Sequence, residues 1–122
     1  MRYRTFGSVE WEASILGFGL GRLPGFEGAP GVIDEQASVA MIRYAIEGGV
    51  NYVDLGYPYE EKRYEIRAHV LRRALQEGFR QKVRVAATAP SFAIDAPQAF
   101  DRWLYGELKA LDAHTIDFCL LP

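Results

Sequence analysis

Residues 34–54 read DEQASVAMIRYAIEGGVNYVD, a helical pattern that runs directly into a strand pattern. Asp34 is a typical N-cap, because its side chain can accept a hydrogen bond from a free backbone N–H of the first turn. Gly48 and Gly49 supply a left-handed stop at the other end. Between these signals, apolar residues recur at helical spacing: Val39, Ile42, Ala45 and Ile46. The β-rich residues 50–54 then predict a strand directly after the helix.

The same alternation continues toward the C-terminus. A second helical stripe ends at Gly78, and residues 83–87 follow as a strand pattern. Its apolar positions are Tyr64, Ala68, Leu71 and Leu75, with Arg67, Arg72, Arg73 and Gln76 away from the stripe. Asp95 and Pro97 open a third helix in the order of cap then proline, and residues 116–121 form a last strand pattern. The expected buried face of the third helix is Phe100, Trp103, Leu104, Leu108 and Leu111.

The N-terminal part adds a hairpin and a first strand. Residues 3–13 alternate in two segments around a tight turn, which predicts a short β-hairpin. Residues 15–18 form a brief apolar run that predicts a buried strand, and residues 24–34 carry too many glycines and prolines for a helix or a strand. Near-continuous apolar strands separated by amphipathic helices predict a parallel α/β sheet. We expect one domain over residues 1–122.

Composition excludes several classes of function. The 122 residues include 14 Lys and Arg against 16 Asp and Glu, a formal charge of -2. Such a balance argues against a nucleic-acid partner. No apolar run reaches the length of a membrane span and the N-terminus lacks a signal-peptide core, so we expect a cytoplasmic protein without membrane contact. The single cysteine, Cys119, cannot form an internal disulfide, and we expect it to be a small buried hydrophobe in its strand.

Candidate functional residues are those at the carboxyl ends of the strands, where ligands bind in parallel α/β folds. Asp54 and Tyr59 are the titratable pair among them. A purely structural interpretation is also open: Asp54 caps the turn that follows its strand, and Tyr59 packs beside Pro58. Gly19 and the nearby Arg22 are candidates for cofactor binding, although a tight turn explains the glycine equally well.

Residues 51–59, NYVDLGYPY, resemble a segment of the aldo-keto reductases. In that family, the aspartate and the tyrosine five residues later are two members of the catalytic tetrad. Further segments resemble the hairpin and the first, third and fourth barrel strands of the family, above all its bacterial and archaeal members: residues 2–11, 16–24, 82–86 and 115–121. The resemblance implies half of a TIM (β/α)8 barrel, comprising its strands 1 to 4, preceded by the hairpin.

The resemblance also implies a reaction, the NADPH-dependent reduction of aldehydes and ketones. In the family, a tyrosine protonates the carbonyl oxygen as hydride arrives from NADP(H). A neighbouring lysine tunes that tyrosine, because a free phenol has a pKa of about 10. An aspartate pairs with the lysine, and a histidine orients the substrate. Carried over by position, the aspartate is Asp54 and the tyrosine is Tyr59.

The other two tetrad members do not carry over. Thr88 stands at the position of the lysine, and Pro122 stands at that of the histidine. Thr88 has no charge with which to tune Tyr59, and Pro122 has no donor to aim at a carbonyl. The charged residues 60–65 replace the usual sequence after the tyrosine, and Lys62 or Arg63 is a less favoured substitute cation.

Length is the largest departure from the family. A complete (β/α)8 barrel needs about 250 residues, and the strand patterns of this chain stop at the fourth strand. The later strands hold most of the NADPH in the family, and the cysteines that bind an iron-sulfur cluster in some relatives would also lie beyond Pro122. We therefore expect no iron-sulfur cluster and no metal.

Two hypotheses of function follow. The first is a catalytically degenerate, truncated aldo-keto reductase-like protein, inactive alone, whose role is interaction. The second is a carbonyl reductase that is active only when a second half completes the barrel. An open sheet leaves unpaired edges and an uncovered inner face, so we expect a homodimer, a separate second half-barrel as partner, or low stability.

Overall fold

The computed structural model describes residues 1–29, 31–59 and 61–122 of the chain. Pro30 of the expected loop and Glu60 of the charged segment lie outside these residues. The chain begins with strands β1 (Tyr3–Thr5), β2 (Glu12–Ser14) and β3 (Phe18–Gly19). Helices and strands then alternate, in the order α1 (Glu35–Glu47), β4 (Tyr52–Asp54), α2 (Glu61–Ala74), β5 (Arg84–Thr88), α3 (Pro97–Leu111) and β6 (Phe118–Leu120).

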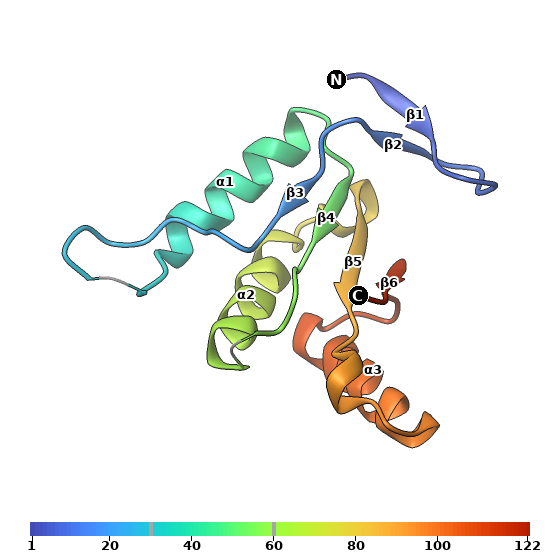
Figure 1. The fold of residues 1–122 in the computed structure, drawn as a ribbon. Helices are drawn as coiled ribbons and strands as arrows, with labels where there is room; N and C mark the ends of the chain where they lie inside the picture. Colours follow the sequence, from blue (N-terminus) through green and yellow to red (C-terminus); the bar gives the residue numbers. More distant parts are fainter. Residues whose placement is uncertain (30, 60) are drawn as a thin grey trace.

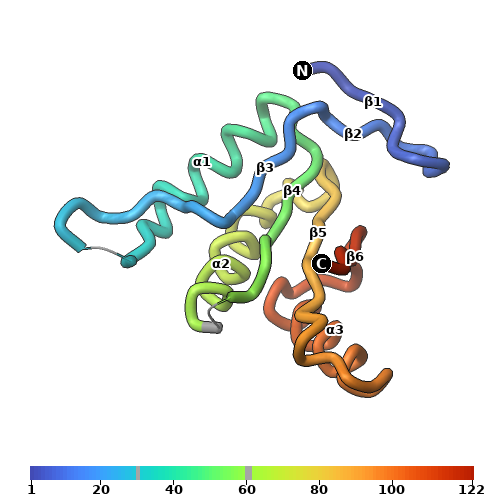
Figure 2. Tube along the Cα trace, viewed as in Figure 1, coloured from blue at the N-terminus to red at the C-terminus, as the bar shows by residue number. Residues whose placement is uncertain are grey.

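Within the described residues, the larger sheet has four parallel strands in the order β3-β4-β5-β6. Strands β1 and β2 form a separate antiparallel hairpin. Figure 1 shows the hairpin at the end of the sheet where the strands begin, and the segment after β3 leaving from the opposite end. Figure 2 shows the helices in chain order, with α1 beside α2 and α2 beside α3. The predicted parallel α/β architecture with an N-terminal hairpin is confirmed.

The hydrophobic core lies between the helices and one face of the sheet. Alternation along each strand decides which residues reach it: Val53 and Val85 are register partners that face the helices. Their neighbours Tyr52 and Ala86 belong to the other face, which would line the interior of a barrel. The fully buried core residues from helices and connecting segments include Leu20, Ile42, Leu55, Val70 and Leu71.

Local signals place α1 as the sequence predicts. The Asp34 carboxylate accepts a hydrogen bond from the Ala37 N–H at 3.0 Å, and Gly49 adopts a left-handed φ of 97° after the helix. The hairpin rests on this turn, since the Tyr3 hydroxyl donates to the Gly49 carbonyl at 3.0 Å. A Cβ at Gly49 would lie 2.7 Å from that hydroxyl. Both the backbone conformation and the close approach therefore require glycine.

The inner face of the sheet is partly covered, contrary to the expectation of a bare face. Phe6 and Trp11 of the hairpin pack on Phe118 of β6, with ring centroids 4.9 and 5.8 Å apart. Tyr52 of β4 completes the cluster, 5.5 Å from Phe118. The hairpin thus closes the end where the strands begin and leaves their carboxyl ends to form the candidate site.

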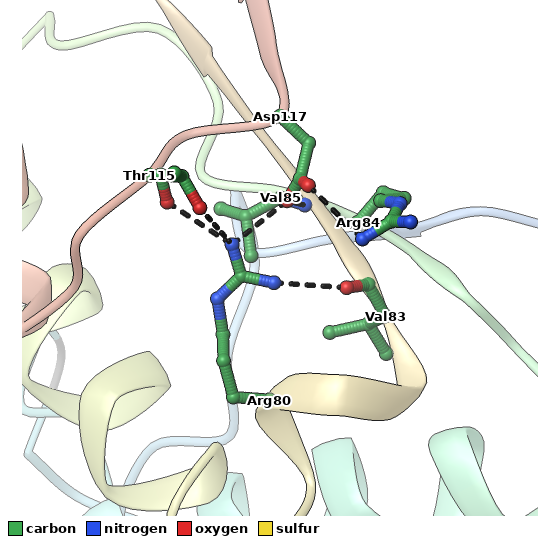
Figure 3. Close-up of polar contacts among 6 residues, drawn as sticks. All are labelled: Arg80, Val83, Arg84, Val85, Thr115 and Asp117. Atoms are coloured by element: carbon green, nitrogen blue, oxygen red, sulfur yellow. Dashed lines mark hydrogen bonds and ion pairs between the residues drawn. The ribbon is translucent and has the colours of Figure 1, made fainter. Parts of the chain in front are cut away.

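Strand β6 is fastened to β5 by a polar cluster (Figure 3). The Asp117 carboxylate accepts from the Val85 backbone N–H and from the Arg80 guanidinium, both at 2.8 Å. Arg80 also donates to the backbone carbonyls of Val83 and Thr115 at 3.0 Å. The cluster supplies a side-chain acceptor for Val85 just before the parallel register of β5 and β6 begins.

Three local expectations were wrong. Ile15 and Leu16 are exposed, because the Ser14 hydroxyl bonds the Leu16 carbonyl at 2.7 Å and bends the chain before the two-residue strand β3. Asp95 does not cap α3: the N-cap is Ala96, which offers no side-chain hydrogen bond. Cys119 is exposed rather than buried, because β6 is an edge strand of the described sheet.

The buried face of α3 contains an acid that the sequence analysis did not select. Glu107 accepts a hydrogen bond of 2.8 Å from the Tyr64 hydroxyl of α2, and both residues are buried. Burial raises the pKa of Glu107, while the Tyr64 and Trp103 side chains act in the opposite direction. The Trp103 indole N–H is itself buried without a hydrogen-bond partner of good geometry among the described residues. Glu107 lies four residues after Trp103 and four before Leu111, so helical spacing already placed it on the apolar face.

This burial has a pH-dependent consequence. Because its pKa is raised in the folded state, Glu107 contributes to the stability of the fold at pH values below its ordinary pKa. This contribution to stability is lost as the pH rises through the folded-state pKa. Glu107→Gln keeps an acceptor for Tyr64 without the charge. We expect this variant to be more stable than wild type at neutral pH and to lose the advantage in acid.

Urea unfolding at pH 7 and pH 4 measures the effect, with Glu65→Gln as the control because Glu65 is an exposed acid of α2. A Glu107→Gln variant less stable than wild type at neutral pH would contradict this account of the α2–α3 contact.

Candidate functional site

The candidate site is built at the carboxyl ends of the strands. Gly19 at the end of β3 pairs with Asp54 at the end of β4, and Asp54 pairs with Ala86 of β5. Thr88 at the end of β5 pairs with Leu120 of β6. The parallel register therefore brings the carboxyl ends of β3, β4, β5 and β6 together at one end of the sheet, as the sequence analysis expected.

Asp54 has a definite structural role. Its carboxylate accepts a hydrogen bond of 2.8 Å from the Gly56 backbone N–H. Gly56 adopts a φ of 79°, so the carboxylate caps a turn that only glycine enters easily. The carboxylate also contributes to the pKa of Tyr52, which is raised by burial and then by the charge of Asp54. The turn-capping interpretation of Asp54 is confirmed.

Tyr59 does not join Asp54. Its side chain is 86% exposed and packs on Tyr57, with ring centroids 4.5 Å apart. No hydrogen bond joins the Tyr59 hydroxyl to Asp54 in the part of the chain that the structure describes. The two side chains that the resemblance assigns to one catalytic group therefore serve separate contacts here.

Thr88 and Pro122, the positions that the resemblance assigns to the lysine and the histidine, lie at the end of β5 and just beyond the end of β6. Thr88 is 8% exposed at the end of β5, and Pro122 is exposed two residues beyond β6. Among the described residues, no ion pair joins Asp54 to Lys62 or to Arg63. Lys62 is exposed, and a guanidinium nitrogen of Arg63 lies where it would be 3.2 Å from a Cβ at Gly31.

A cavity of about 410 Å³ opens beside these strand ends. The segment after β3 forms one wall and the start of α2 forms the other. Its polar and charged lining residues include Arg22 and Tyr59, which the sequence analysis selected, and Arg63 and Arg67. Gly19 does not line it, although a Cβ there would meet no atom within 4 Å. The described lining residues include no acid.

Arg67 is the residue of this site that the sequence analysis missed. We expected it to lie away from the buried stripe, yet it is only 9% exposed. Its guanidinium donates to the Tyr57 carbonyl at 3.1 Å and lies 5.3 Å from the centre of the Tyr64 ring. The signal was present, since Arg67 follows Tyr64 by three residues and precedes Leu71 by four.

Among the described residues, none of the helices has the length and apolar composition of a membrane-spanning helix. Within the same residues, no group of at least three His, Cys, Asp or Glu side chains is placed to hold a metal ion.

Comparison with known proteins supports the fold. No family model matches the sequence. Among solved structures, the chain is similar to a thermostable aldo-keto reductase crystallised with the inhibitor epalrestat, with a TM-score of 0.78 and 24% sequence identity. The match covers 99% of this chain and 42% of that protein. The chain therefore has the fold of part of an aldo-keto reductase barrel and spans less than half the length of that enzyme.

Proposed function

We propose that this chain is a half-barrel of the aldo-keto reductase type that does not reduce carbonyl compounds on its own. The observation that carries the proposal is Thr88. It occupies the end of β5, on the same face of the sheet as Asp54, where the resemblance calls for the tetrad lysine. Without a cation at residue 88, the site lacks the group that prepares the tyrosine for proton transfer in the family.

The rest of the site supports the same conclusion. Tyr59 is turned out to solvent against Tyr57, and the Asp54 carboxylate is engaged with the Gly56 backbone. Pro122 offers no donor to orient a carbonyl oxygen. NADP(H) supplies the hydride in the family, but these residues do not fit the reaction that it undergoes there.

The proposal is tested by following NADPH consumption with a panel of aldehydes and ketones. We expect wild type and Tyr59→Phe to be indistinguishable from buffer. Tyr105→Phe is the matched control, because Tyr105 is an exposed tyrosine of α3 outside the site. Saturable turnover that Tyr59→Phe removes and Tyr105→Phe retains would overturn the proposal.

A second candidate function is a reductase completed by assembly. Strands β3 and β6 are the edges of the described sheet, and Leu121 beyond β6 is 76% exposed. Exposed strand edges and apolar side chains favour association. A second copy or a separate half-barrel would then supply the remaining strands, with Asp54 and Tyr59 contributed by this chain.

Sedimentation velocity at micromolar concentration tests this second candidate. The expected result is a dimer or larger species that dissociates on dilution. A compact monomer that unfolds cooperatively at the same concentration would contradict self-assembly.

A further inference from the structure

The cavity beside the strand ends carries an inference that does not depend on catalysis. Arg22, Arg63 and Arg67 line it together, and none of its described lining residues is an Asp or a Glu. Its volume of about 410 Å³ falls within the range of small-molecule sites. The guanidinium groups of Arg22 and Arg67 concentrate positive charge in a space from which bulk water is partly excluded.

Arg67 gives the second and independent observation. Its side chain is nine-tenths buried, yet it makes no ion pair with any residue that the structure describes. Its hydrogen bonds to described residues go to the carbonyls of Tyr57 and Arg63, which are uncharged acceptors. A buried cation without a counterion is unfavourable unless a bound anion supplies the charge.

The other arginines stand around this buried one. Arg22 is exposed on the segment after β3 and makes no hydrogen bond or ion pair within the described residues. Arg63 lies one helical turn before Arg67 on α2. Gly21 and Gly25 also line the cavity, so backbone on that wall is not covered by side chains of its own. The wall after β3 and the wall from α2 thus both present guanidinium groups.

We propose that this cavity binds the phosphoryl group of a small phosphorylated molecule, held by Arg22 and Arg67. Guanidinium groups match phosphate geometry through paired N–H donors, and a multiply charged anion balances both arginines better than one carboxylate does. Tyr59 at the same cavity offers an aromatic ring and a hydroxyl to the remainder of the ligand.

Isothermal titration of inorganic phosphate, pyrophosphate and NADPH into the full chain tests the site at constant ionic strength. We expect saturable binding of pyrophosphate, weakened about tenfold in Arg22→Gln through loss of one charge-assisted contact. Arg102→Gln is the matched control, because Arg102 is an exposed arginine of α3 outside the cavity. Thermal unfolding of both variants verifies that the fold is intact.

The arms of the titration separate the sources of the phosphoryl group. Parallel weakening of pyrophosphate and NADPH binding in Arg22→Gln supports a dinucleotide ligand. Weakening of inorganic phosphate binding alone supports a phosphate monoester. Absence of binding, or an equal effect of Arg22→Gln and Arg102→Gln, would overturn the proposal. None of these outcomes depends on whether the chain reduces a carbonyl.

Discussion

A chain carrying Thr88→Lys and Pro122→His is expected to reduce carbonyl compounds with NADPH when it self-associates. Its rate should exceed the lowest rate detectable with wild type by about 10²- to 10⁴-fold, which is the usual contribution of a tuned general acid. The reason is positional. Thr88 lies two residues beyond Ala86, the register partner of Asp54, so both side chains belong to the same face. Pro122 lies two residues beyond Leu120, the partner of Thr88.

The introduced groups would supply what the wild-type site lacks. An ammonium group at residue 88 lies on the same face as the Asp54 carboxylate and favours the ionised form of a nearby phenol. An imidazole at residue 122 offers a donor to a carbonyl oxygen. Adding Tyr59→Phe to the double variant must abolish the gain, because the proton would come from that hydroxyl.

The gain is measured as the rate of NADPH consumption at protein concentrations above and below the dissociation constant of the assembly. Thr88→Lys alone, which restores the cation but not the donor, serves as the intermediate control. A double variant as inactive as wild type at all concentrations would contradict the assembly candidate, because the absent strands rather than the two side chains would then be limiting.

Asp117→Ala is expected to destabilise the fold by about 1.5–3 kcal/mol, the range for hydrogen bonds to charged groups. The Asp117 side chain is only 14% exposed and accepts from both Arg80 and the Val85 backbone N–H. Its removal leaves a central-strand N–H and a partly buried guanidinium without that acceptor. The polar cluster of Figure 3 therefore depends on the Asp117 carboxylate.

Chemical denaturation with Asp101→Ala as the control measures this loss, because Asp101 is an exposed carboxylate of α3 and its removal changes the net charge equally. Hydrogen exchange adds a local readout, since the amides of β6 should lose more protection than those of α1. Equal stabilities of the two variants would show that the cluster does not hold the edge strand.

The architecture was predictable because several independent signals agree along the chain. Asp34 and Gly49 mark the two ends of α1 in the sequence, and they do so in the structure as well. The alternation of helical and strand patterns sufficed for a parallel sheet. The length of the strand expected over residues 15–18 was overestimated, because the apolar character of Ile15 and Leu16 does not reveal the Ser14 hydrogen bond that bends the chain there.

The candidate site was less predictable than the fold. Residue type alone assigned Arg67 to solvent, although its helical position beside Tyr64 and Leu71 placed it inward. The separation of Tyr59 from Asp54 depends on the path of the β4–α2 connection, which periodicity does not encode. Glu107 shows the same limit, because a charged residue on an apolar stripe becomes informative only once its partner Tyr64 is known.

The most direct test of the proposal that the wild-type chain does not transfer hydride is an isotope experiment. The protein at stoichiometric concentration is incubated with NADPH deuterated at the transferable position of the nicotinamide and with an aldehyde, and the alcohol is analysed by mass spectrometry. The account predicts no more deuterium in the alcohol than Tyr59→Phe or buffer produces. Deuterium transfer that requires both the protein and Tyr59 would contradict it.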